Sequence, residues 1–185
     1  TSHTFRRVTW KAAIDHRLSQ DVMVYGSYSR GYKAGTYNTI PLSAEPANPE
    51  IVDAYEVGLK SELFGRRVRL NGALFWSDIK DPQVQTVVGT GFSAASGLIN
   101  AGSARTRGAE LSVTAVATSG LELRGNVTYL DAKYTDFTNA PHYEGGVLGG
   151  PSSYPILTGA TDIGSEAIFP ANFDATSYRL PNAPK

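Results

Sequence analysis

The stretch from Arg7 to Leu18, RVTWKAAIDHRL, decides the fold because its side chains alternate in character along its whole length. Every second residue reads VWAIHL, and the residues between them read RTKADR. Successive side chains of a β-strand point to opposite faces, so this stretch predicts a strand with one apolar and one charged face. It is about twice as long as an ordinary soluble strand and close to the length that crosses a bilayer at a tilt. We therefore expect a transmembrane β-barrel.

The composition excludes several other classes. The chain has 185 residues, with 17 Lys and Arg against 17 Asp and Glu, and it has no cysteine. This balance argues against a nucleic-acid-binding surface, which needs a basic surplus. The lack of cysteine excludes disulfides, thiolate metal sites and a cysteine nucleophile. No stretch of the sequence approaches the roughly 18 apolar residues of a membrane helix, but the alternating strands of a barrel escape a hydropathy scan.

Further strands follow the first one, and we expect an all-β, antiparallel up-and-down meander of about six long strands. They are predicted over residues 7–18, 22–30, 55–62, 67–77, 109–115 and 121–129. The second strand alternates poorly, so the sequence does not assign its faces. The fourth continues as a polar stretch over 78–85 through Pro82, which cannot donate to a ladder and suggests a bulge or a rim.

The connections between the strands differ in length from one rim to the other. Short turns are predicted near Ser19, Gly65 and Ser119, and long loops near 31–50, 87–98 and 137–184, the last without sustained periodicity. Membrane barrels combine minimal turns on one rim with long loops on the other. About six strands cannot close around a charged lumen, since the smallest bacterial membrane barrels have about eight. We therefore expect residues 1–185 to be a partial section of a transmembrane β-barrel.

A soluble β-sandwich, for example an adhesion module, is the alternative, because its strands also have one apolar and one polar face. Three features favour the membrane barrel: the length of the strands, the alternation of loop lengths, and aromatic residues near strand ends. Membrane barrels carry such aromatic girdles at both interfaces. The aromatic residues in question are Trp10, Tyr25, Tyr55, Trp76 and Tyr129.

Several strings of this sequence resemble the barrel of TonB-dependent outer-membrane receptors. They are YSRGYKAG (28–35) with Tyr37-Asn38, Pro49-Glu50 followed by AYEVGLK (54–60), Phe75-Trp76 with DIKD (78–81) and QVQ (83–85), Asn100-Ala101-Gly102 with GAEL (108–111), and LPNAPK (180–185). Each string is weak alone, but their order and spacing are specific together. In this family roughly 22 strands surround an N-terminal plug. Neither a plug domain nor a TonB box is found in the sequence, so the resemblance implies an internal part of a barrel.

The resemblance implies a receptor in the outer membrane of a Gram-negative bacterium that takes up a scarce ligand by energised transport. The ligand would be a ferric siderophore, cobalamin or a glycan. The implied partners are outer-membrane lipid, the plug domain of the same full-length chain, the TonB energy-coupling complex acting through the N-terminal part, and the small-molecule ligand. A passive porin-like channel remains an alternative because the predicted lumen is polar.

Charged residues of the polar parity are the candidate lumen-facing side chains. Two interpretations stay open: they form a neutralising ladder between strands, or they hold a plug through polar contacts that can be broken. They are Arg7, Lys11, Asp15, Arg17, Glu56, Lys60, Glu62, Arg67, Arg69, Glu110, Glu122 and Arg124.

Aromatic residues of the long loops are the candidate ligand contacts, with packing within the loops as the alternative. They are Tyr32, Tyr37, Phe92, Tyr143 and Tyr154. The sequence has no nucleophile elbow, phosphate loop or carboxylate-pair motif, so no enzymatic activity is expected. Its histidines, His3, His16 and His142, lack ligand spacing, and we expect neither a metal site nor a cofactor.

Overall fold

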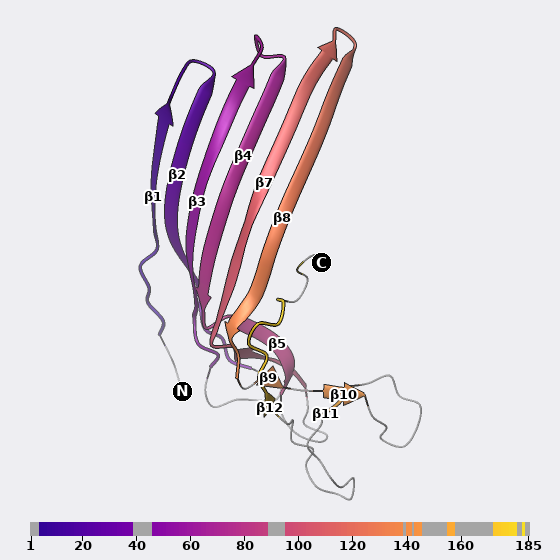
Figure 1. Cartoon of the computed structure of the whole chain (residues 1–185). Helices are drawn as coiled ribbons and strands as arrows, with labels where there is room; N and C mark the ends of the chain where they lie inside the picture. Colours follow the sequence, from indigo (N-terminus) through magenta and orange to yellow (C-terminus); the bar gives the residue numbers. More distant parts are fainter. Residues whose placement is uncertain are drawn as a thin grey trace, which may run out of the picture.

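Six long strands form one antiparallel sheet in the computed structural model of the chain (Figure 1). The structure describes residues 4–38, 46–88, 95–138, 140–141, 143–145, 155–157, 172–180 and 183. The strands follow the order β1-β2-β3-β4-β7-β8, so each pairs with the next long strand along the chain. Their bounds are β1 Trp10–Arg17, β2 Val22–Lys33, β3 Glu50–Leu63, β4 Val68–Lys80, β7 Ser103–Thr118 and β8 Leu121–Asp136. The predicted meander of about six long strands is confirmed.

The register between the strands keeps apolar residues on one face of the sheet. Val57 of β3 pairs with Leu74 of β4, which pairs with Ala109 of β7. On the opposite face Glu110 of β7 pairs with Ala73 of β4 and with Thr128 of β8. A shift by one residue would exchange the two faces, so the alternation in the sequence sets the register. We call these two faces the apolar face and the charged face.

The faces of β2, which its own sequence leaves unassigned, are fixed by its neighbours. Gly26 pairs with Val57 and Tyr28 pairs with Tyr55, so these residues lie on the apolar face. Tyr25, expected in an outward aromatic girdle, lies on the charged face instead, where it pairs with Asp15 and Gly58. That expectation was wrong because the sequence of β2 does not show which of its residues face outward. The pairing with β3 decides this.

All three short turns lie at the same end of the sheet, the upper end in Figure 1, and they confirm the predicted hairpins. The β3–β4 turn spans residues 64–67, in which Phe64, Gly65 and Arg66 all have positive φ. Arg67 donates its backbone N–H to the carbonyl of Phe64 and so closes this turn. Arg67 was expected as a residue of the fourth strand and lies in the turn instead.

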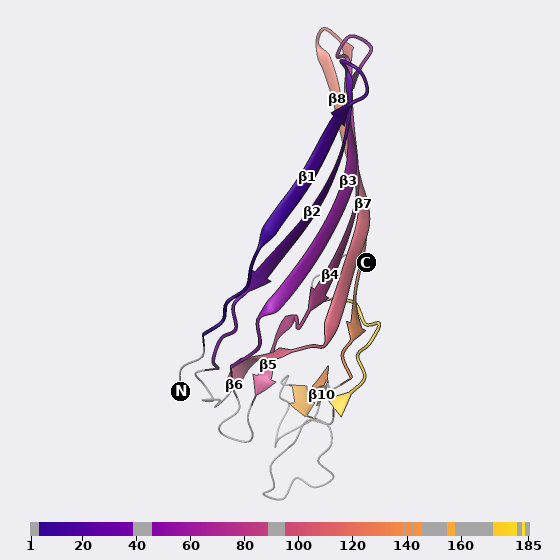
Figure 2. The same cartoon turned by 90° about the vertical axis from the view of Figure 1, so that its left-hand side faces the viewer.

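A hairpin that the sequence did not predict stands at the other end of the sheet. β5 (Gln83–Val88) pairs antiparallel with β6 (Ala95–Asn100) and forms a separate two-stranded sheet (Figure 2). Asp81 has a φ of 53°, and Pro82 follows it, so the chain leaves the ladder of β4 at this point. The polar stretch after Lys80 is therefore not the far end of the fourth strand, and part of the expected loop at 87–98 is strand.

The end of the sheet opposite to the turns carries a small core of short segments. β9 (Ala140–Pro141) pairs with β12 (Asn172–Phe173), and β10 (Tyr143–Gly145) pairs with β11 (Pro155–Leu157). These pairings correct the expectation of a stretch without regular structure after residue 137. The buried residues of this small core are Ala101, Ala104, Tyr134, Phe137, Ala140 and Ala175. Thr176 accepts from the backbone N–H of Phe137, and its hydroxyl and backbone N–H lower the pKa of Asp174.

The apolar face of the long sheet is uncovered within the described residues. Val57, Leu74 and Val127 are 56%, 59% and 68% exposed. Among the described residues none of the larger side chains is fully buried. The soluble β-sandwich needs a second sheet packed on this face, so the arrangement contradicts it. The sheet is open, which is consistent with a partial barrel. The described part of the chain contains no helix of the length and apolarity needed to cross a membrane.

Candidate functional site

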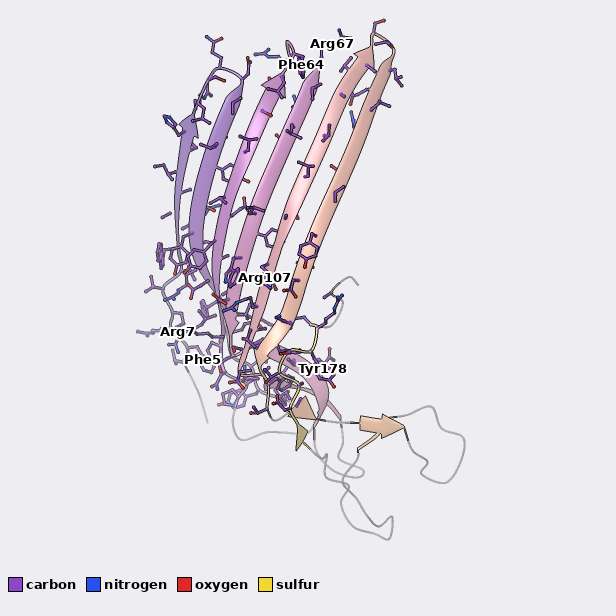
Figure 3. All side chains as sticks on the ribbon, in the orientation of Figure 1. Phe5, Arg7, Phe64, Arg67, Arg107 and Tyr178 are labelled. Atoms are coloured by element: carbon purple, nitrogen blue, oxygen red, sulfur yellow. The ribbon has the colours of Figure 1, made fainter. Side chains whose placement is uncertain are left out.

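The charged face gathers most of the candidate lumen residues. Arg67 lies in the β3–β4 turn, and Arg7 precedes β1 (Figure 3). The register places the other candidates on one face, within the five strands β1, β3, β4, β7 and β8. These residues are Lys11, Asp15, Arg17, Glu56, Lys60, Glu62, Arg69, Glu110, Glu122 and Arg124.

Tyr25 is the centre of one polar group on this face. Its hydroxyl donates to Glu56 Oε1 at 2.7 Å, and the Nζ of Lys60 lies 5.3 Å from the centroid of its ring. The Tyr25 ring also covers Gly58, where an added Cβ would lie 2.4 Å from ring atoms. The missing side chain at Gly58 therefore gives the ring its position, and the hydroxyl holds the carboxylate of Glu56.

A second group of charges lies nearer to the short turns. Glu62 accepts from Arg69 at 3.0 Å and from Arg66 at 3.2 Å, and Arg124 pairs with Glu122 on β8. The arginine side chains of these pairs are 61%, 80% and 75% exposed. Exposed pairs contribute well under about 1 kcal/mol each. These ion pairs are therefore weak and exchangeable.

Strand β1 carries charges that have not been neutralised locally. Within the described residues Lys11, Asp15 and Arg17 take part in no ion pair. All of β1 is exposed, and its residues face Met23, Tyr25 and Ser29 of β2 across the ladder. Within the described residues the charged face therefore carries ion pairs on β3, β4 and β8 and unpaired charges on β1, the edge strand of the sheet.

The candidate ligand contacts are not brought together by the described structure. Tyr32, expected in the long loop near 31–50, lies in β2, where it pairs with Ile51 on the apolar face of the sheet. Tyr37 is half-buried in the segment between β2 and β3. The backbone of Tyr143 belongs to β10, and its side chain lies outside the described residues, as do Phe92 and Tyr154 altogether.

Hydrogen bonds from side-chain amides tie the β5–β6 hairpin to the segment between β2 and β3. Asn38 exchanges two hydrogen bonds with the backbone of Leu98, at 2.9 and 2.7 Å. Gln83 donates to the carbonyls of Ala34 and Asn48, and Asn100 Oδ1 accepts from the backbone N–H of Asn48 at 2.7 Å. Segments that are far apart in the sequence therefore form one unit beside the long strands.

The apolar face ends in a row of aromatic side chains on the side of the long connections. The ring of Tyr28 stacks on Tyr55, with centroids 4.7 Å apart, and meets the edge of Trp10 at 4.4 Å. Trp76 pairs with Tyr55 in the next strand, and so continues the row. Tyr129 of β8 lies two residue pairs nearer to the turns than Trp76, on the same face. Trp10, Tyr55, Trp76 and Tyr129 thus lie where an outward aromatic girdle was expected.

Charged side chains replace the apolar ones on the apolar face immediately beyond the aromatic row. Two residues after Trp76 stands Asp78, and two residues before Tyr55 stands Asp53. Asp53 accepts both a two-pronged pair from Arg30, at 2.7 Å for each bond, and the hydroxyl of Tyr28 at 2.6 Å. The sequence reasoning missed this row of ion pairs, although the apolar parity of each strand changes to charged residues at the same level.

On β4, β7 and β8 the same row is built around Trp76. Its indole N–H donates to Asp78 at 2.9 Å, and Arg105 donates to the other oxygen of Asp78 at 2.8 Å. Arg107 donates to Asp131 at 2.9 Å. We call the outward charges beside and beyond the aromatic row the ionic belt. Its residues are Arg30, Asp53, Asp78, Lys80, Arg105, Arg107, Asp131 and Lys133.

The height of the apolar face matches a membrane. Val68 begins β4 beside the short turn, and Asp78 belongs to the ionic belt. At about 3.4 Å per residue this interval spans about 34 Å along the strand. A tilt of about 40° reduces it to about 26 Å, close to the roughly 25 Å apolar band of an outer-membrane barrel. The aromatic row and the ionic belt therefore mark one membrane–water interface.

Comparison with known proteins gives the same answer as this geometry. Residues 1–183 match the family model described as TonB dependent receptor-like, beta-barrel. The chain is 26% identical over 133 residues to the ferrichrome outer membrane transporter/phage receptor of Escherichia coli K12, covering 72% of this chain and 17% of that protein. The chain thus spans less than a fifth of that relative's length.

Solved structures resemble the fold as well. The ferric yersiniabactin uptake receptor of Yersinia pestis is 27% identical, with a TM-score of 0.52 over 69% of this chain and 19% of that one. A copper transporter, 16% identical with a TM-score of 0.55 over 66% of this chain and 20% of that one, resembles it in fold alone. These relatives are transporters or receptors of the outer membrane and not enzymes. The chain belongs to the β-barrel family of TonB-dependent receptors of the Gram-negative outer membrane.

Proposed function

We propose that this chain is a section of the barrel wall of a receptor that takes up a scarce small molecule by energised transport. Among the ligand classes considered, a ferric siderophore is best supported, because two relatives carry ferrichrome and ferric yersiniabactin in their names. Cobalamin and a glycan are the other candidates. The energy would come from the TonB complex, and the plug of the full-length receptor would occupy the lumen.

The exchangeable charges of the charged face are the observation that carries this proposal. Exposed ion pairs such as Arg69–Glu62 and Arg66–Glu62 can bind a polar partner and release it again at little cost. A wall that must hold a plug and let it move needs contacts of this kind. An apolar lining would instead bind a plug by burying apolar surface. A pulling force would then have to expose all of that surface to water.

The test measures uptake by cells that depend on the full-length receptor containing this segment. The probes are radioiron-labelled ferrichrome, labelled cobalamin and a labelled maltodextrin, each supplied with and without a protonophore. Saturable uptake of at least one probe that the protonophore stops is expected. Absence of energised uptake for all three probes contradicts the proposal.

A passive porin-like channel is the second candidate, because the charged face carries ionic side chains on five of its strands. The purified full-length protein in a planar bilayer discriminates the two functions. A channel gives steady conductance at low voltage, whereas a plugged receptor gives none until denaturant loosens its plug. Steady conductance together with protonophore-resistant uptake would favour the channel.

A further inference from the structure

The ionic belt carries a surplus of positive charge on its β4, β7 and β8 side. At one level of the sheet Asp78 pairs with Arg105, which pairs with Lys133. At the next level Trp76 pairs with Arg107, which pairs with Asp131. Lys80 stands one level beyond them, toward the long connections. Lys80, Arg105, Arg107 and Lys133 carry four positive charges against three negative charges on Asp78, Asp131 and Asp136, the last of which pairs with Ser103 at the level of Lys80, a surplus of one. The Arg30–Asp53 pair on β2 and β3 is balanced and does not change this surplus.

The two arginines of this patch are held in place and still accessible. Their guanidinium groups lie 4.5 and 5.4 Å from the centroid of the Trp76 ring. Arg105 donates to Asp78 through Nε, and Arg107 donates to Asp131 through Nε, with a terminal nitrogen 2.9 Å from the same oxygen. A guanidinium has five N–H donors, so each arginine keeps others for a further acceptor. Their side chains remain 37% and 47% exposed.

The two lysines of this patch add positive charge that close ion pairs within the sheet do not neutralise. Lys80 is exposed and forms no ion pair within 4 Å among the described residues, although its charge acts on the carboxylate of Asp53. Lys133 lies 3.9 Å from Asp131, whose carboxylate is already taken by Arg107. An ion pair at that distance on an exposed surface contributes little. Both ammonium groups are thus available to an anion that approaches from outside the barrel.

The depth of the patch indicates which anion arrives there. The aromatic row marks the interface, and the patch begins at the level of Trp76 and extends beyond it on the face that meets lipid. Lipid phosphates occupy this level of a membrane, and basic residues near it attract anionic headgroups. We propose that Lys80, Arg105, Arg107 and Lys133 bind the phosphate group of an outer-leaflet lipid. This assignment rests on the outward facing of the apolar face and is independent of the transported ligand.

Two lysine substitutions test the proposal without breaking either arginine–carboxylate pair. Lys80→Gln and Lys133→Gln are made singly and together in the full-length receptor, which is purified in a neutral detergent. The matched control is Lys33→Gln, because Lys33 ends β2 at the same rim but pairs with Glu50 on the charged face. Each protein is titrated with phosphatidic acid, phosphatidylcholine or inorganic phosphate, and bound lipid is counted by native mass spectrometry.

The wild-type receptor is expected to bind phosphatidic acid more tightly than phosphatidylcholine. Each lysine substitution should weaken phosphatidic acid binding about fivefold, the effect of one basic residue near a membrane surface. Lys33→Gln should leave it unchanged. Equal affinities for the two lipids, or an equal loss in the Lys33→Gln control, would overturn the proposal. Inorganic phosphate that displaces phosphatidic acid at equal concentration would also overturn it, since the site would then take a free anion. Ligand uptake by the wild-type receptor is measured in parallel. Absence of that uptake would contradict the proposed transport function and would not bear on lipid binding.

Discussion

Val127 and Thr128 are neighbours on β8 that face opposite sides of the sheet, so arginine at these two positions tests the facing of the wall. Val127 pairs with Leu111, which pairs with Gly72 of β4, four residues from Trp76 of the aromatic row. This interval corresponds to about 14 Å along the strand, or about 10 Å of depth at a tilt of about 40°. Val127 therefore lies close to the middle of an apolar band about 25 Å tall.

Arginine at the midplane of a barrel's lipid face costs roughly 2–4 kcal/mol. Val127→Arg should therefore lower the free energy of unfolding of the full-length receptor by that amount. Thr128→Arg should cost less than about 1 kcal/mol, because Thr128 is exposed on the charged face opposite Glu110. Tyr129 belongs to the aromatic row near the interface, so Tyr129→Arg should cost less than Val127→Arg.

The assay is urea unfolding of the receptor in phosphatidylcholine vesicles, with the midpoint and slope measured for each variant. Thr128→Arg is the control for the bulk and charge of arginine itself. Equal penalties at Val127 and Thr128, or a larger one at Thr128, would refute the assignment of the apolar face to lipid.

Further predictions concern single interactions. Asp53→Asn should lower the stability by roughly 1.5–3 kcal/mol in the same urea assay, because it removes the charged acceptor of both Arg30 and Tyr28; a cost equal to that of Asp81→Asn would contradict this. Gly58→Ala should destabilise by roughly 1–3 kcal/mol, since its Cβ would meet the Tyr25 ring at 2.4 Å, whereas Gly125→Ala, with open space around it, should be near neutral; similar costs would argue against the close packing of Tyr25. Intact cells should label a cysteine at Thr138, beside the long connections, and not one at Ser119 in a short turn; the reverse would invert the topology.

The sequence predicted the meander well wherever one parity of a strand is consistently apolar. In β3, β4 and β7 the alternation around Val57, Leu74 and Leu111 sets the register, because a slip would turn apolar side chains to the wrong face. The short turns followed from the same strands, since each ends where the alternation stops. The facing of the charged residues on these strands could therefore be predicted from parity alone.

Other features escaped because they depend on pairing or on a local bend. Tyr25 was misplaced because β2 takes its phase from β3, a long-range contact that no local pattern contains. The β5–β6 hairpin was missed because the positive φ of Asp81, together with Pro82, turns the chain out of the sheet within two residues. The ionic belt was missed for a different reason. Its charged residues occupy the alternate positions that are apolar earlier in each strand. They can be recognised as one belt only when the register between neighbouring strands is known.

The most direct test of the lipid-facing wall is an accessibility scan along β8 in the full-length receptor reconstituted in a bilayer. Single nitroxide spin labels are placed at consecutive positions from Leu123 to Tyr129, and their collision rates with oxygen and with a water-soluble nickel chelate are measured. We expect a period of two, with oxygen favoured at Leu123, Gly125, Val127 and Tyr129 and the chelate favoured at the positions between them. A scan without alternation, or one with the opposite phase, would contradict this expectation.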